Sequence, residues 1–100
     1  MSPGGLSLAP RILAAAAQFY GIGVEDLCTP RRFDFPKRVR HVAMFLMRDL
    51  TPASYTEIAR RVGRTNHTTA LHGVRKMRRL SMVEAPLARE LAALRAALES

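Results

Sequence analysis

Residues 63–72, Gly-Arg-Thr-Asn-His-Thr-Thr-Ala-Leu-His, decide the fold of this chain. The stretch opens with Gly63, which frees the backbone for a tight turn, and Asn66 is a good N-cap for a helix. The first turn of that helix carries His67, Thr68 and Thr69, whose side chains can hydrogen-bond to base edges or phosphates. A helix start of this kind, in a basic protein, is what entry into the major groove of DNA requires.

The segment before this stretch predicts a partner helix. Ser54 and Glu57 have the spacing of a capping box, and the helix that they open is predicted for residues 55–62. The helix that follows the turn is predicted for residues 67–82. Its inner face is formed by Ala70, Leu71, Val74 and Met77. Two helices joined by a turn of four residues, 63 to 66, indicate a helix-turn-helix motif.

The remaining periodicity is helical as well, so the predicted fold class is all-α. We expect residues 1–8 to be a flexible N-terminus and residues 9–98 to form one compact domain that ends in a C-terminal helix. Cys28 to Phe35 is interpreted as a loop. The further helices are predicted for residues 9–20, for one turn at 24–27, for 36–50 and for 86–98.

The charge indicates a polyanionic partner. The chain carries a net charge of +8. Residues 31–79 hold thirteen basic and three acidic side chains, a balance of +10, and the remainder holds three basic and five acidic, a balance of −2. A positive block flanked by acidic ends favours a face for nucleic acid. The alternative is a solvated surface that happens to be basic.

Several classes of function are disfavoured. The single cysteine, Cys28, excludes an internal disulfide and fits a reducing compartment, so we expect a cytoplasmic, nucleoid-associated protein. The longest weakly polar stretch, 12–17, is far shorter than the ~20 residues of a membrane helix. His67 and His72 are five residues apart and do not share a helix face, so no metal site is expected. No catalytic constellation, cofactor or small-molecule substrate is indicated, and the chain is not expected to be an enzyme.

From about Ile12 to Leu98, the chain resembles the C-terminal DNA-binding domain of the bacterial replication initiator DnaA family. The landmarks occur in the order of the family. They are Phe19-Tyr20-Gly21-Ile22, Val24-Glu25-Asp26-Leu27, the basic pair Arg31-Arg32, Arg40-His41-Val42-Ala43-Met44, Asp49-Leu50-Thr51, Glu57-Ile58 and His67-Thr68-Thr69-Ala70-Leu71-His72.

The resemblance implies binding to a short duplex element, the DnaA box, by a recognition helix in the major groove and an arginine in the adjacent minor groove. Carried over by position, the base-reading residues are Asn66, His67, Thr68 and, in the minor groove, Arg32. The residues expected at the DNA backbone or groove edge are Thr69, Arg31, Lys37, Arg40, Arg48, Tyr55, Thr56, Arg64, His72 and Lys76.

Three departures from the family bear on function. Asn66 stands where the family usually has Asp, and Asn favours adenine whereas Asp accepts a hydrogen bond from cytosine. Residues 33–35, Phe-Asp-Phe, dilute the basic loop. The glycines cannot form a Gly-x4-Gly-Lys-Ser/Thr phosphate loop, so no ATPase activity is expected in these residues.

Two classes of function stay open. In the first, the chain is a free-standing regulator that binds DnaA-box-like sites and controls replication initiation or transcription. In the second, it is a protein-interaction module for a replication initiator or RNA polymerase, with DNA binding secondary. His67, Thr68, Thr69 and Arg32 favour the first, because an interaction module does not need them. The chain could also be an excised piece of an initiator, and its Met1 start favours a stand-alone protein.

Overall fold

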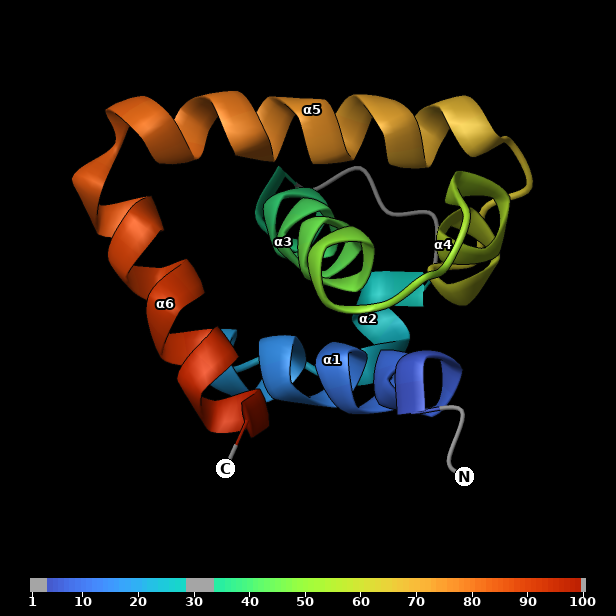
Figure 1. Ribbon diagram of the computed structural model, residues 1–100, viewed down its shortest axis with the longest axis horizontal. Coiled ribbons are helices and arrows are strands. Elements are labelled where there is room, and N and C mark those ends of the chain that lie inside the picture. Colours follow the sequence, from blue (N-terminus) through green and yellow to red (C-terminus); the bar gives the residue numbers. More distant parts are fainter. Residues whose placement is uncertain (1–3, 29–33, 100) are drawn as a thin grey trace.

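The structure is a computed structural model that describes residues 4–28 and 34–99. The described part contains helices and no strands, which confirms the all-α fold class (Figure 1). The helices are α1 (Gly4–Tyr20), α2 (Val24–Cys28), α3 (Asp34–Leu50), α4 (Tyr55–Arg61), α5 (His67–Val83) and α6 (Ala85–Glu99).

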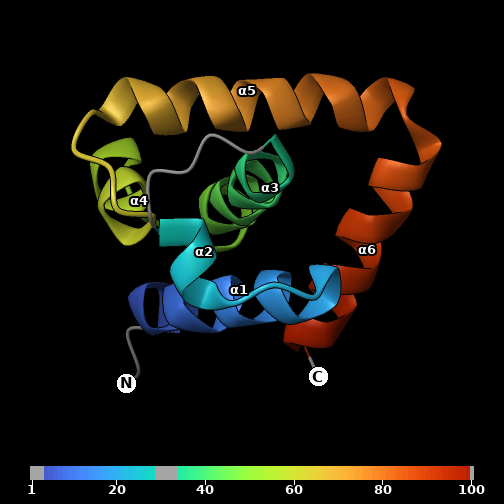
Figure 2. The same cartoon turned by 180° about the vertical axis from the view of Figure 1, so that it is seen from behind.

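Helix α3 lies in the middle of the molecule, with α5 crossing it on one side and α1 on the opposite side (Figures 1 and 2). The apolar face of α3 forms the centre of the core, where Val42, Ala43 and Leu46 are completely buried. Ile12 of α1 and Leu94 of α6 close the core from the other side. Both ends of the described chain lie on the side away from α5 (Figure 1).

Two helices begin two or more residues earlier than predicted. Helix α1 starts at Gly4 instead of Ala9, so it includes part of the segment expected to be flexible, and Pro10 lies inside the helix. Residues 1–3 lie outside the described part of the chain. Helix α3 starts at Asp34, which corrects the prediction that residues up to Phe35 form a loop. Pro36 then occupies the first turn, where the missing N–H has no helical partner to lose.

Gly73 allows α5 to approach α3 closely. A Cβ atom at this position would lie 2.6 Å from Met44 Cε and 2.9 Å from His41 Cδ2, closer than a methyl group can normally pack. Met44 and Gly73 are both buried at the crossing. Because Gly73 has no side chain, the basic faces of α3 and α5 can lie close together.

Helix α6 is tied to the rest of the molecule by polar contacts. The Tyr20 hydroxyl donates to Glu90 Oε1 at 2.6 Å, and burial, reinforced by this bond, raises the pKa of Tyr20. Arg95 Nε donates a hydrogen bond to Asp49 Oδ2 at 2.9 Å, and Arg95 Nη2 lies 2.8 Å from the same oxygen. These contacts fix α6 against α1 and α3.

Among the described helices, none combines the length and the apolar character needed to cross a membrane.

Candidate nucleic-acid interface

Local hydrogen bonds define both ends of α4, the first helix of the motif. The Glu57 N–H donates to Ser54 Oγ at 3.2 Å, and the Ser54 N–H donates to Glu57 Oε1 at 2.9 Å, which confirms the predicted capping box. The bond from the Ser54 N–H, together with the Ser54 side chain, holds the pKa of the Glu57 carboxyl below its usual range. At the other end Gly63 has a φ of +74°. The N–H of Gly63 donates to Arg60 O and that of Arg64 to Ala59 O, the Schellman pattern.

The turn between α4 and α5 packs directly against the end of α2. A Cβ atom at Gly63 would overlap the carbonyl oxygen of Cys28, so no side chain fits there. The Cys28 thiol in turn lies 3.5 Å from the carbonyl oxygen of Arg61, to which it donates a weak hydrogen bond. Residue 28 is the last before the segment that holds Arg31 and Arg32. The end of α2 therefore lies beside the helix-turn-helix turn.

Asn66 caps α5 as predicted. Its Oδ1 accepts hydrogen bonds from the Thr68 N–H at 2.9 Å and from the Thr68 hydroxyl at 2.7 Å. The Asn66 backbone is extended, with a φ of −97° and a ψ of 121°, as an N-cap requires. The cap thus connects two of the predicted base-reading side chains before any DNA is bound.

The first turn of α5 is exposed and carries no acidic residue. Asn66 and His67 are exposed, and Thr68 and Thr69 are half-buried. The unpaired N–H groups at a helix N-terminus carry a partial positive charge, which attracts phosphate. Further along the helix His72 and Lys76 are exposed too. These predicted site residues share one helix, with its polar surface accessible to a ligand.

Helix α3 adds a second basic surface beside α5. Lys37 is exposed and His41 is half-buried against the glycine at the crossing. Burial, together with the positive charges of Lys76, Lys37 and Arg40, lowers the pKa of His41 to about 4. The structure therefore brings the predicted backbone contacts Lys37 and Lys76 close to the same histidine, which is neutral at pH 7.

Arg40 has a different position from the other basic residues. It is only 4% exposed, and its Nε donates to the carbonyl oxygen of Leu27 at 2.8 Å. Burial and the neighbouring charge of Arg64 lower the pKa of Arg40. Arg40 thus ties the end of α2 to α3, which gives it a structural task, and its predicted contact with a DNA phosphate stays a prediction. Arg64 is half-buried beside it.

Arg48 and Tyr55 lie together at the start of α4. The Arg48 guanidinium carbon is 4.3 Å from the centre of the Tyr55 ring, and the same side chain donates to the Ala53 carbonyl at 3.1 Å. Thr56 is exposed next to them. The structure therefore brings the predicted groove-edge residues Arg48 and Tyr55 together, while Arg31 and Arg32 lie outside the described part of the chain.

Sequence reasoning assigned no part in this interface to Cys28 or Gly73. Cys28 contacts Gly63, which is 35 residues later in the sequence, and no local sequence pattern predicts a contact over that separation. Gly73 offered a weak signal, because it lies three residues after Ala70 and four before Met77 on the inner face of the helix. A glycine at a core position of a helix indicates close approach of another element.

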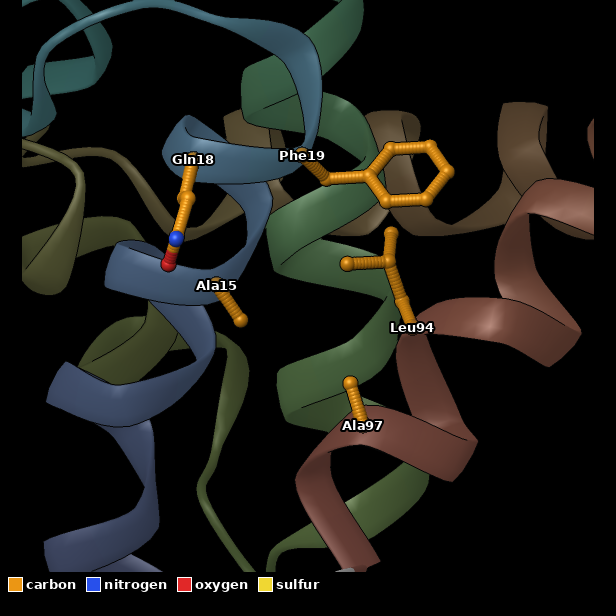
Figure 3. A pocket seen from close by; sticks show the side chains of 5 residues that line it. All are labelled: Ala15, Gln18, Phe19, Leu94 and Ala97. Carbon is orange, nitrogen blue, oxygen red and sulfur yellow. The ribbon is translucent and has the colours of Figure 1, made fainter.

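A shallow pocket of about 340 Å³ lies elsewhere, between α1 and α6 (Figure 3). The lining residues are Ala15, Gln18, Phe19, Leu94 and Ala97. It lies away from α4 and from the start of α5, so it is separate from the candidate interface. Within residues 4–28 and 34–99, no group of three or more His, Cys, Asp or Glu residues is placed to hold a metal ion.

Comparison with known proteins bears on the same residues. Residues 9–77 match the family model described as "Bacterial dnaA protein helix-turn-helix". The chain is 43% identical over 84 residues to the "Chromosomal replication initiator protein DnaA" of Cereibacter sphaeroides (strain ATCC 17029 / ATH 2.4.9), which covers 84% of this chain and 18% of that protein. The protein of the same name from Sphingopyxis alaskensis is 39% identical over 89 residues, 89% of this chain and 20% of the relative. The chain spans about a fifth of the length of these curated relatives.

Proposed function

The chain belongs to the bacterial DnaA helix-turn-helix family, and on that premise we propose that it binds double-stranded DNA at a DnaA-box-like element. The observation that carries the proposal is the exposed first turn of α5. This turn presents Asn66, His67 and Thr68 from a capped helix whose start is set by a glycine turn. Short polar groups on a rigid helix end suit hydrogen bonding to base edges.

The proposed interface has two parts, one for each groove of the duplex. Helix α5 supplies Asn66, His67 and Thr68 for the major groove and Thr69 for a phosphate. Arg32 is assigned to the adjacent minor groove, whose narrow A·T-rich form attracts arginine. The contact of Gly63 with Cys28 supports this pairing, because Cys28 precedes Arg32 by only four positions in the sequence and lies beside the turn that leads into α5.

The remaining contacts are assigned to phosphates and to the groove edge. Positive and polar side chains on α3, α4 and α5 surround the start of the recognition helix, and they fix the register of the protein on DNA without reading sequence. The residues assigned to this task are Arg31, Lys37, Arg48, Tyr55, Thr56, Arg64, His72 and Lys76. Arg40 is assigned to a phosphate as well, and its bond to the Leu27 carbonyl also fixes the end of α2 against α3.

In the cell, we assign this chain to the control of replication initiation or of transcription, in the cytoplasm at the nucleoid. These 100 residues contain no phosphate-binding loop, so we assign DNA binding and no ATPase activity to them. The competing function is binding to a replication initiator or RNA polymerase. The polar first turn of α5 favours DNA, because a protein-binding surface is normally more apolar at its centre.

Selection of bound sequences from a pool of random duplexes tests the proposal. We expect one asymmetric DNA sequence motif with an A·T-rich flank.

Arg32→Ala should weaken binding to the selected sequence by roughly 1–3 kcal/mol, with the loss concentrated at its A·T-rich flank. Arg89→Ala is the matched control, because Arg89 is an exposed arginine on α6, which packs at the opposite end of α5 from the proposed base-reading turn (Figure 1), and its loss should change little. A pool without enrichment would favour the protein-interaction function instead. An equal loss on every sequence would reassign Arg32 to a phosphate.

A further inference from the structure

Three basic side chains meet where α3 and α5 cross. Lys37 and His41 are one helical turn apart on α3, and Lys76 is on α5. The imidazole lies against Gly73, three residues before Lys76, with His41 Cδ2 2.9 Å from the position of a Cβ there. Both lysines are exposed. The result is a histidine flanked by one lysine from each helix.

The two ring nitrogens of His41 lie on the part of the imidazole opposite the edge that contacts Gly73. The carbon edge of the ring, Cγ and Cδ2, is the part turned toward α5. In the described part of the chain, every fully buried side-chain nitrogen or oxygen has a hydrogen-bond partner. His41 makes no side-chain hydrogen bond there, so its nitrogens keep access to solvent. The described charged groups that face the ring are positive, namely Lys37 and Arg40 from α3 and Lys76 from α5.

We propose that one DNA phosphate binds between Lys37, His41 and Lys76, and that His41 takes up a proton when it does, so that DNA affinity rises as the pH falls. This rests on the proposed DNA binding. In the free protein three positive neighbours disfavour a fourth charge. An arriving phosphodiester brings a negative charge that reverses this balance, and a protonated imidazole can donate a charge-assisted hydrogen bond to it. The proton comes from solvent and adds to a ring nitrogen, and no other bond changes.

Linkage gives the size of the effect. Consider pH values between the pKa of His41 in the free protein and its pKa in the complex. In that range, DNA binding is accompanied by the uptake of as much as one proton, so the affinity changes up to about tenfold per pH unit. We therefore expect the affinity of the unmodified chain to rise about five- to tenfold more between pH 7.5 and pH 6 than the affinity of His41→Gln. Glutamine keeps a polar side chain of similar reach and cannot be protonated in this range.

The experiment titrates the selected duplex from pH 5.5 to 8 at fixed salt with the unmodified chain, His41→Gln and His72→Gln. His72 is an exposed histidine of α5, so its variant measures what any histidine near DNA contributes. In parallel, the NMR signals of the His41 ring are followed against pH in the free chain and in the complex. We expect the ring to be neutral at pH 6 when free and protonated at pH 6 when bound.

The outcomes separate this inference from the function on which it rests. If no duplex is bound at pH 7.5, the proposed function is wrong. If the duplex is bound and His41 stays neutral in the complex at pH 6, or if His41→Gln keeps the full pH dependence, the proton-coupled phosphate site is wrong and DNA binding stands. The NMR measurement uses the unmodified chain, so a variant that folds poorly does not remove the test.

Discussion

The helix cap that Asn66 forms at the start of α5 and the base contact proposed for it require the same atom. Its Oδ1 accepts from both the N–H and the hydroxyl of Thr68. A carbonyl oxygen has two lone pairs, so both are engaged in the free protein. Pairing with adenine through N6 and N7 also needs this oxygen as an acceptor. We infer that the Thr68 hydroxyl must turn away, toward DNA, when Asn66 contacts a base.

Replacement of Asn66 by Asp should separate these tasks. Asp can accept both hydrogen bonds from Thr68 and caps helices about as well, so thermal stability should change little. The preferred base at one position should move from adenine toward cytosine by ~1–3 kcal/mol. The measurement titrates a set of single-base variants of the selected site with the unmodified chain and with Asn66→Asp at fixed salt.

Asn66→Ala is the control, which removes the cap and should cost ~0.5–2 kcal/mol of stability. Identical base profiles for Asn and Asp would leave Asn66 as a cap only.

The two glycines with positive φ provide a matched pair. Gly21 has a φ of +73°, and a Cβ placed there would have nothing within 4 Å, whereas at Gly63 the added atom overlaps the Cys28 carbonyl oxygen. Alanine at either position should lose roughly 1–2 kcal/mol from the left-handed backbone. Gly63→Ala should lose more, because the turn must also move away from α2. Urea unfolding of both variants measures the difference. Equal losses would mean that the turn adapts and that this contact holds nothing in place.

At the scale of single elements, the sequence was informative wherever the interaction is local. Ser54 and Glu57 are three residues apart, and Asn66 and Thr68 are two apart, so the caps of α4 and α5 could be predicted. The close approach at Gly73 could not be predicted, because it joins residues about 30 positions apart and depends on how α3 and α5 cross. The buried position of Arg40 has the same cause, since its partner Leu27 lies on another helix.

The crossing of α3 and α5 should make stability depend on pH. The pKa of His41 is about 4 in the folded chain and about 6.5 in an unfolded one, so the unfolded state binds the proton first. Stability is therefore complete above pH 7 and falls as the pH drops from about 6.5 toward 4. By pH 5 the loss should be roughly 1 kcal/mol, allowing for the partial exposure of the ring.

Urea unfolding at pH 7.5 and pH 5 checks this dependence. His41→Gln should show a smaller loss than the unmodified chain, while His72→Gln should show the same loss, since His72 is exposed. An unchanged pH dependence in His41→Gln would show that the ring is solvated and that α5 does not constrain its protonation.

For the whole molecule, the basic block predicts a strong dependence of DNA binding on salt. If about six basic side chains meet phosphates, the slope of log K against log salt should be near −5. Lys76→Gln should reduce the slope by about one, and Arg89→Gln, on α6, should leave it unchanged. Fluorescence titrations at several salt concentrations measure these slopes. A slope shallower than about −2 would mean that this block is not the DNA face.

The overall arrangement of the helices went beyond what sequence patterns contain. The all-α class and the order of the helices follow from periodicity, and the family resemblance was confirmed. The placement of α6 depends on Tyr20 with Glu90 and on Asp49 with Arg95, pairs that are 70 and 46 residues apart. Pairing at such distances is decided by packing of the whole core. The role of Arg32 rests on the resemblance and stays a prediction.

The position of the two chain ends has a practical consequence. The start of α1 and the end of α6 both lie on the side opposite α5, across the 30 Å dimension of the molecule (Figure 1). A fluorescent label, a sensor surface or a second protein attached at either end would therefore leave the recognition helix pointing outward. Tethering through the amino end and tethering through the carboxyl end should consequently give the same affinity for a duplex in solution.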